Sequence, residues 1–328
     1  MKNTLVKLVL KRLLSSITVM FLLITMMFIL LRISPGSYTQ KFISPDLNPA
    51  LAEQVNISFG LNEPILVQYK NFLMNLIVGD FGVSYSFREP VSTVIFRHLP
   101  LTAVIALLSF LIEIFIGIFL ASLVLKKNRE KLDKFFSSAS IFIFALPSFV
   151  VGVFFLMIFS DLTGLFPSSG IKSFDFDQYN FIGKLLDYFH HLVLPVLTIS
   201  LGGTALFYKY ASDNMKEIST KYFITNLRAN GVGERTIILK HIIPNSISPL
   251  ISAAGVELGI LLGGTLITEV IFSLPGMGRL TVNAILQRDY PLVIGCVFIS
   301  GALIILSNFL ADLIKGKLDK RVIKEMLG

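Results

Sequence analysis

Long uncharged apolar runs constrain this chain more than any other feature of its sequence. The first occupies residues 13–31, between Arg12 and Arg32. As a helix it would rise about 28 Å, close to the thickness of the hydrocarbon core of a bilayer. Because a backbone in lipid must satisfy its own hydrogen bonds, such runs cross a membrane as helices. The chain is therefore predicted to be an all-α integral membrane protein with six transmembrane helices, at about 13–31, 99–125, 135–160, 192–208, 249–271 and 291–311.

Composition supports this fold class and excludes a soluble protein of ordinary residue usage. The 328 residues are 54% hydrophobic and 15% charged, with a mean hydropathy of +0.75. A net charge of +8 can indicate nucleic-acid binding, but here the Lys and Arg residues gather between apolar runs rather than on one basic face. The first run is longer than a signal-peptide core and no small-residue cleavage site follows it, so we expect a retained helix.

The distribution of positive charge predicts the orientation of the helices. Twenty of the 29 Lys and Arg residues fall in the N-terminal segment, the 126–134 loop, the 209–241 segment and the tail from Lys315. Short loops rich in Lys and Arg stay on the cytoplasmic side of a membrane. Both termini and the segment 209–248 are therefore expected in the cytoplasm.

Two outward segments are too long or too patterned to be plain connectors. The outward loop 33–98 is expected to fold on the outer surface, with an amphipathic helix within 59–83. The loop after the fifth span begins with the turn signal Pro275-Gly276-Met277-Gly278, and the apolar pattern at 280–285 predicts a short re-entrant or surface helix. No soluble domain or internal repeat is evident, so residues 1–328 are interpreted as a single transmembrane domain.

Two carboxylates fall within predicted spans, where an ionised group needs a partner or a cavity. Glu113 is interpreted as a structural carboxylate. Glu257 shares its helix with Gly255, Gly259 and Gly263, whose four-residue spacing lets another helix approach closely. This glycine ladder fits either packing within the chain or a seam against a second membrane subunit. Glu257 fits either a structural role or a role in lining a path.

The sequence contains no evident set of residues spaced for catalysis or for metal binding. It has no G-x-x-x-x-G-K-[ST] phosphate-binding loop. The adjacent residues His190 and His191 would point about 100° apart on a helix, which favours an interfacial role over chelation of one ion. Cys296 is the one cysteine, so no internal disulfide can form. We therefore expect no catalytic residue, metal or cofactor in this chain.

The basic segment 209–248 is predicted to fold into two short helical pieces, separated by Gly231 and followed by Pro244. Glu234 in the first turn of the second piece and Lys240 in its last turn follow the charge order that suits a helix dipole. On pattern alone, this segment is either a docking surface or padding at the membrane surface. The residues of the first piece that can share one apolar face are Ile218, Tyr222, Phe223 and Leu227.

The spacing from Gly231 to Pro244 resembles the cytoplasmic coupling loop of ABC importer permeases. The pattern of that family is Glu-Ala-Ala, three residues, Gly, nine residues and Ile-x-Leu-Pro. Here the glycine and the proline match, and His241 and Ile243 occupy the Ile and Leu positions. The triplet 225–227 is Thr-Asn-Leu in place of Glu-Ala-Ala, so no specific contact is carried over to those three residues.

Other segments are similar, nearly from end to end, to the first-subunit type of permease in the dipeptide, oligopeptide and nickel branch of this family. The resemblance implies a type I ABC importer permease fold in a bacterial cytoplasmic (inner) membrane. The matching segments are Lys11-Arg12-Leu13-Leu14, Leu31-Arg32-Ile33-Ser34-Pro35-Gly36, Phe59-Gly60-Leu61-Asn62-Glu63-Pro64-Ile65, Gly79-Asp80-Phe81-Gly82-Val83-Ser84, Leu146-Pro147-Ser148-Phe149, Leu194-Pro195, Glu269-Val270-Ile271-Phe272-Ser273-Leu274-Pro275-Gly276-Met277-Gly278 and Arg288-Asp289-Tyr290-Pro291.

The resemblance also implies partners and a mechanism. This chain would line one path with a second homologous permease subunit, while two ATPase subunits, which bind ATP and Mg, dock on the coupling helices. Closure of the ATPase pair would open the path outward to a substrate-binding protein. Glu234 and Arg235 would add charge pairing at the rim of the ATPase groove. The residues implied in ATPase coupling are Arg228, Ala229, Gly231, Glu234, Arg235 and Pro244, and those implied in binding-protein contact or outer-gate closure are Glu269, Pro275, Gly276, Gly278, Arg288 and Asp289.

The expected substrates are dipeptides or oligopeptides, because no His or Cys lies deep in the predicted path. Import of nickel or a metal chelate by the same architecture is the alternative. A stand-alone secondary transporter would show membrane-embedded charge networks and inverted repeats, and a membrane enzyme would show polar catalytic clusters at span ends. Neither is evident, and a scaffold role does not account for the coupling-loop spacing.

Overall fold

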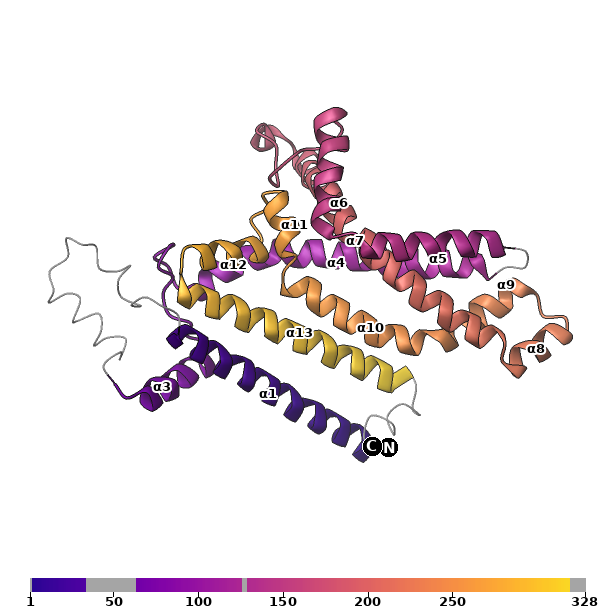
Figure 1. Cartoon of the computed structure of the whole chain (residues 1–328), viewed down its shortest axis with the longest axis horizontal. Coiled ribbons are helices and arrows are strands. Elements are labelled where there is room, and N and C mark those ends of the chain that lie inside the picture. Colours follow the sequence, from indigo (N-terminus) through magenta and orange to yellow (C-terminus); the bar gives the residue numbers. More distant parts are fainter. Residues whose placement is uncertain (1, 34–62, 126–128, 319–328) are drawn as a thin grey trace.

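A computed structural model describes residues 2–33, 63–125 and 129–318 as an elongated bundle of helices (Figure 1). Within these residues no β-strand forms, apart from a single bridge between Val83 and Pro90. The predicted all-α fold is confirmed. Residues 34–62 of the predicted outward loop lie outside the described residues. The helices are α1 (Lys2–Ile33), α3 (Ile65–Ile77), α4 (Val91–Val124), α5 (Glu130–Ala145), α6 (Ser148–Phe155), α7 (Phe181–Ser219), α8 (Tyr222–Ala229), α9 (Glu234–Ile237), α10 (Ile243–Gly263), α11 (Leu266–Ile271), α12 (Met277–Leu286) and α13 (Tyr290–Leu318).

Five helical stretches of the described chain are long and apolar enough to cross a membrane, and there are six if one bent pair counts as a single span. The bent pair joins α5 to the segment 148–162 at an angle of 97°. The apolar run 135–160 is therefore two segments rather than one continuous helix. Leu146 ends α5 in an extended conformation, with ψ of 128°, because a residue that precedes proline avoids the helical region.

Two other predicted spans also have different bounds in the structure. α7 extends beyond 192–208 at both ends, and Pro195 lies inside it. Prolines are tolerated inside membrane helices because neighbouring groups satisfy the freed backbone, so Pro195 does not mark the start of this helix. The predicted span 249–271 starts earlier and is interrupted after α10, where Gly264 has a φ of +122° before α11 begins.

Glycines bring α10 and α13 into close backbone contact. A Cβ on Gly255 would overlap Ala311, and a Cβ on Gly259 would lie 3.0 Å from Ile304 Cα. Gly263 faces the Ile304 side chain in the same way. The structure thus places the glycine ladder in a helix interface within the chain, which is one of the two interpretations that the spacing left open.

The basic segment folds onto α7 rather than extending freely from the bundle. α4 crosses α7 where a Cβ on Gly117 would lie 2.7 Å from Phe207 Cβ. Beyond this crossing, one apolar core joins α7 to α8, α9 and the π-helical turn Ile238–Ile242. The buried side chains of this core that come from α7 and the basic segment include Phe207, Tyr208, Ala211, Met215, Ile224, Ile237, Ile238 and Ile242.

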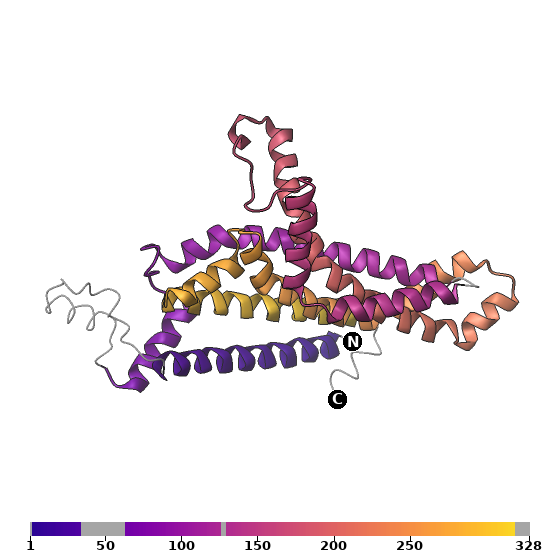
Figure 2. The ribbon, with the colours of Figure 1, turned by 45° about the horizontal axis from the view of Figure 1, so that its top comes forward.

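The start of α1 and the end of α13 lie toward the end of the bundle at which α8 and α9 project (Figure 1, Figure 2). A 2.9 Å ion pair between Arg12 and Asp312 joins α1 to α13. At the opposite end, α3 lies within the stretch predicted to hold an amphipathic helix, and it packs on α1 through Phe28 and Tyr69, whose ring centroids are 5.1 Å apart. The start of α1, the end of α13 and the α8–α9 region therefore share one end, and the side of the membrane on which it lies stays a prediction from the charges.

We predict that Gly255→Ala destabilises the purified protein, whereas Gly202→Ala does not. The added methyl group at Gly255 would overlap Ala311, and overpacking of this kind costs about 1–3 kcal/mol. At Gly202 no atom lies within 4 Å of an added Cβ, and alanine favours a helix by about 1 kcal/mol over glycine. Thermal unfolding in detergent measures the difference. Equal melting temperatures for the two variants would contradict the proposed α10–α13 contact.

Candidate functional site

A short hairpin of α8, Gly231 and α9 projects from one end of the bundle (Figure 1). Gly231 has a φ of +75°, in the left-handed region that favours glycine. The Arg228 Nη2 and Nε atoms donate to the Glu234 carboxylate at 2.8 and 3.2 Å, and Nη1 donates to the Ser219 carbonyl at 3.2 Å. The Arg228 guanidinium therefore joins both sides of the Gly231 turn to the end of α7.

Arg228 and Glu234 form an ion pair with each other, so their charges are already partly neutralised within this chain. Hydrogen bonding to Glu234 raises the pKa of the Arg228 guanidinium above its ordinary value. The two side chains are 41% and 40% exposed, so water screens their attraction. Glu234 pairs within this chain, whereas the sequence suggested that it pairs with a partner. Arg228, Ala229, Gly231 and Arg235 are all exposed on the hairpin.

The apolar residues of the first helical piece do not share one face. Ile218 and Leu227 pack on the core, and Ile224 is fully buried in it. Tyr222 is 91% exposed and Phe223 is also exposed. The prediction of one shared face is therefore wrong for Tyr222 and Phe223, because α7 ends between Ile218 and Tyr222 and the residues do not belong to one helix.

Pro244 lies in the first turn of α10, directly after the π-helical turn Ile238–Ile242. A proline in a first turn loses no hydrogen bond within its helix, because the N–H groups there have no partner in the helix. Helical structure therefore continues from the hairpin into the predicted fifth span. Pro244 is exposed at this junction.

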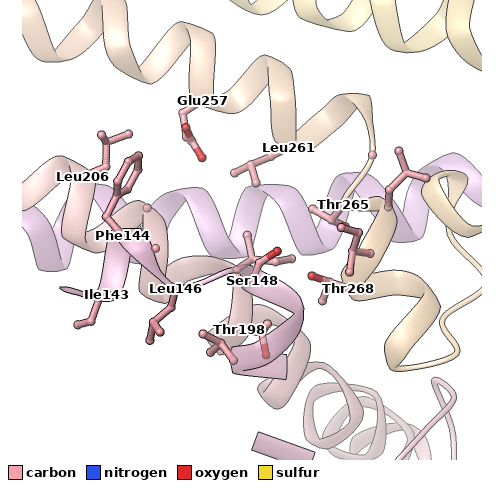
Figure 3. A pocket seen from close by; sticks show the side chains of 17 residues that line it. Ile143, Phe144, Leu146, Ser148, Thr198, Leu206, Glu257, Leu261, Thr265 and Thr268 are labelled. Atoms are coloured by element: carbon pink, nitrogen blue, oxygen red, sulfur yellow. The ribbon is translucent and has the colours of Figure 1, made fainter. Parts of the chain in front are cut away.

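A cavity of about 400 Å³ lies where the α5–α6 bend, α7, α10 and α11 meet (Figure 3). Gly264 lines it at the break between α10 and α11. Leucine, isoleucine and phenylalanine side chains form most of the wall. The polar side chains that line the cavity are Ser148, Thr198, Glu257, Thr265 and Thr268.

One carboxylate, that of Glu257, lines the cavity, and a second, that of Glu113, lies behind its wall. Glu257 projects from α10 toward the cavity (Figure 3). Glu113 of α4 is fully buried against Gly203 of α7, where a Cβ on the glycine would overlap the carboxylate. Gly203 and Glu257 both line the cavity, which places Glu113 directly behind its wall. Among the described residues, neither Glu113 oxygen has a hydrogen-bond partner.

Glu269 of α11, which is fully buried, fastens the outer loop through its carboxylate. Its Oε1 accepts a 2.8 Å hydrogen bond from Thr102 Oγ1, and its Oε2 accepts a 3.0 Å bond from the Arg279 backbone N–H. Gly276 and Gly278 leave the space that this carboxylate occupies, since a Cβ on either would approach it too closely. The loop 275–279 is thereby fastened to α4 and α11.

Asp289, which is also fully buried, fastens a second outer segment. Its Oδ2 accepts hydrogen bonds from Ser84 Oγ at 2.5 Å and from the Ser86 N–H at 2.9 Å. Its Oδ1 accepts a 3.3 Å bond from the Leu292 N–H in the first turn of α13. Asp289 therefore joins the segment before α4 to the start of α13.

The burial of these groups corrects the predicted outer surface. Glu269 and Asp289 are fully buried, and Gly276 and Gly278 are buried with them. The carboxylates therefore brace the outer loops and cannot touch a binding protein in this conformation. The two other residues predicted for that contact, Pro275 and Arg288, are exposed.

The adjacent histidines point to different partners. His190 Nε2 lies 2.8 Å from the Leu165 carbonyl, and His191 Nδ1 lies 2.8 Å from the Asp187 carbonyl. This geometry suits two interfacial side chains rather than one chelating pair. In the described parts of the chain, no group of three or more His, Cys, Asp or Glu residues is arranged to hold a metal ion.

Sequence reasoning missed Thr102, Gly203 and Ser84 as parts of these sites. The sequence offers only weak signals for two of them. Thr102 carries a hydroxyl group within an apolar run, and Gly203 belongs to a glycine doublet within another apolar run. Thr102 and its partner Glu269 are 167 residues apart. No local pattern indicates a pairing at that separation.

Two family profiles together match most of the chain. The one described as "Binding-protein-dependent transport system inner membrane component" matches residues 113–324, and the N-terminal profile of such membrane components matches residues 5–106. The oligopeptide transport system permease protein AppB of Bacillus subtilis (strain 168) is 30% identical over 315 residues, which cover 96% of this chain and 98% of that protein. The nickel import system permease protein NikB of Staphylococcus aureus (strain MRSA252) is 31% identical over 319 residues, which cover 96% and 92%.

Solved structures share the fold at lower sequence identity. A chain of the MetNI methionine ABC transporter, in an inward-facing conformation, matches with a TM-score of 0.52 at 18% identity, covering 69% of this chain and 96% of that one. A second crystal form gives a TM-score of 0.51 at 16% identity, covering 72% and 97%. The predicted type I importer permease fold is confirmed. The chain therefore belongs to the family of binding-protein-dependent transport system inner membrane components, and it is a multi-pass permease subunit of an ABC importer.

Proposed function

We propose that this permease pairs with a second homologous permease subunit and that two ABC ATPase subunits dock on the cytoplasmic hairpins of the pair. ATP and Mg bind the ATPase subunits, and an extracytoplasmic binding protein delivers substrate to the outer end. The observation that carries this proposal is the α8–α9 hairpin. It is exposed at its tip and anchored at its base by Ile224 and Ile237, which are both fully buried.

The anchoring explains how motion of an ATPase would reach the path. The core beneath the hairpin includes Phe207 and Met215 of α7 and reaches α10 at Leu250. α7 and α10 are also two walls of the cavity that holds Glu257. Displacement of the hairpin would therefore move both walls together, as expected for a coupled two-state element.

We propose peptides as the substrate class. The relative AppB is named as an oligopeptide transport permease, and it is similar over nearly its whole length. The cavity has apolar walls, a few hydroxyls and one carboxylate. A volume near 400 Å³ is within the range of about 300–1,000 Å³ for small-molecule sites.

Nickel import is the second candidate, because the relative NikB is named as a nickel import permease at 31% identity. Free nickel prefers nitrogen and sulfur ligands, and no His or Cys is among the residues that line the cavity. A chelated ion would present the chelator rather than the metal to the path. Peptides are therefore the first proposal, and a nickel chelate is the second.

Purification of the tagged chain from its own cells tests the proposed assembly. We expect a second permease and ATPase subunits to copurify, and the reconstituted complex to import peptides supplied with its binding protein. If the complex imports a nickel chelate and no peptide, the second candidate replaces the first. Recovery of this chain alone, with transport that needs no ATPase, would contradict the assembly.

Gly231→Val is predicted to impair ATP-driven import more than Gly231→Asn. No atom lies within 4 Å of a Cβ added at Gly231, so both side chains fit the space. The difference is conformational, because asparagine tolerates the left-handed region and a β-branched residue does not. Import rate per molecule of assembled complex is the measurement. Equal import by the two variants would show that the shape of the Gly231 turn is not required.

Charge exchange tests the brace inside the hairpin. Arg228→Glu and Glu234→Arg are each predicted to reduce import, and the double exchange is predicted to restore part of it. The exposed pair contributes only about 0.2–1 kcal/mol to folding, so the membrane level of each variant should stay near that of the wild type. A double variant as impaired as the worse single variant would indicate that Arg228 or Glu234 acts directly on the ATPase instead.

Arg288→Glu is predicted to weaken stimulation of ATP hydrolysis by the binding protein, since Arg288 is exposed on the outer end. Gln287→Glu is the matched control, because it adds a carboxylate to the neighbouring exposed position. Titration of the binding protein against the reconstituted complex gives the concentration for half-maximal stimulation. If this concentration is the same for the two variants, Arg288 does not belong to the proposed contact.

A further inference from the structure

Glu113 is a buried acidic group that the proposed coupling mechanism does not use. It has no exposed surface, and both of its carboxylate oxygens lack a hydrogen-bond partner among the described residues. A buried carboxylate without a partner is costly in a membrane protein. The arrangement around Glu113 is therefore incomplete within this chain.

The space that Glu113 occupies borders the cavity. Its carboxylate lies over Gly203, whose missing side chain provides the room, and Gly203 is itself one of the cavity-lining residues. Glu257 approaches from the cavity side on α10 (Figure 3). The junction of α4, α7 and α10 therefore places one acidic group on the cavity wall and another directly behind it.

The cavity holds no cation of its own to offset these carboxylates. None of the residues that line it is Lys, Arg or His. Two carboxylates that lie close together repel each other when both are charged, and a cation between them relieves both the repulsion and the loss of hydration. A positively charged group supplied from outside the chain would therefore complete the site.

The chemistry of the lining favours an ammonium group over a metal ion. An ammonium group donates hydrogen bonds and is satisfied by carboxylate and hydroxyl oxygens. The lining supplies such oxygens from Glu257 and from Ser148, Thr265 and Thr268. Transition-metal ions favour imidazole and thiolate ligands, and the described residues contain no group of three or more His, Cys, Asp or Glu side chains suited to a metal.

We propose that Glu113 and Glu257 form a recognition site for a protonated amine, through which the amino terminus or a lysine side chain of a peptide passes during import. This inference rests on the proposed peptide transport function and names a substrate feature for it. Only Glu257 faces the cavity directly, whereas Glu113 lies behind Gly203. Such a site binds weakly enough to release its ligand, which conduction along a path requires.

Thiol labelling in the assembled complex tests the site without depending on transport. Gly202→Cys, made in a Cys296→Ala background, places a thiol on the cavity wall, where no atom lies within 4 Å of an added Cβ. The probes are aminoethyl methanethiosulfonate, which carries an ammonium group, and neutral methyl methanethiosulfonate. The ratio of their reaction rates cancels differences in access to the cavity.

We expect Glu257→Gln and Glu113→Gln each to lower the cationic-to-neutral rate ratio, by about tenfold for Glu257 and by less for Glu113. Asp213→Asn is the matched control, because Asp213 is an exposed carboxylate on α7 paired with Lys209 and away from the cavity lining. An unchanged ratio in both Gln variants would overturn the proposal. A ratio that rises would overturn it too, and so would a thiol that reacts with neither reagent.

A transport comparison separates this inference from the proposed function. The complex is supplied with one peptide in two forms, with a free and with an acetylated amino terminus, at saturating binding protein. Glu257→Gln is expected to reduce the preference of import for the free amine, while Asp213→Asn leaves it unchanged. A carboxylate-dependent labelling ratio together with no peptide import by the wild type would overturn peptide transport and keep the amine site. Peptide import with a preference unchanged by Glu257→Gln would keep the transport function and overturn the role of the amine site in import.

Discussion

Close approach of helix backbones at glycines is the constraint on which this bundle depends. In lipid, burial of apolar side chains does not drive helices together, so association depends on packing and on hydrogen bonds between helices. Gly255 and Gly259 let α10 meet α13, and Gly117 lets α4 meet α7 at Phe207. α7 and α10 each also form a wall of the cavity.

Buried carboxylates act in two different ways in this structure. Glu269 and Asp289 are surrounded by donors and fasten the outer loops to α4, α12 and α13. Glu113 is equally buried but has no donor among the described residues. A satisfied carboxylate rigidifies the segments that it joins, whereas an unsatisfied one lacks the hydrogen bonds that burial normally requires. Glu269 and Asp289 therefore have a structural role, which distinguishes them from Glu113 of the candidate recognition site.

The helices connect the two functional ends without an intervening loop. α7 runs from the outer region past the cavity to the core beneath the hairpin, and α10 follows the hairpin directly after a π-helical turn. Gly264 interrupts the second of these paths at the cavity, where its φ of +122° lets α11 take a new direction. The cavity therefore lies beside a break between two helices, at a glycine whose backbone conformation other residues rarely adopt.

The sequence by itself determined that the chain has several apolar spans and roughly where they lie, that basic residues cluster between them, and that the coupling loop has its glycine-to-proline spacing. These properties are read from residues close together in the chain, because hydrophobicity, charge and turn preference are local.

The sequence did not determine that α5 breaks from α6, that Pro195 lies inside α7, or that Tyr222 and Phe223 are exposed. Only the tertiary structure decided that the glycine ladder faces α13, that Glu269 and Asp289 are buried clamps, and that Glu113 lies behind Gly203. Each of these depends on which distant helix supplies the neighbouring atoms, and a pairing such as Thr102 with Glu269, 167 residues apart, leaves no local pattern.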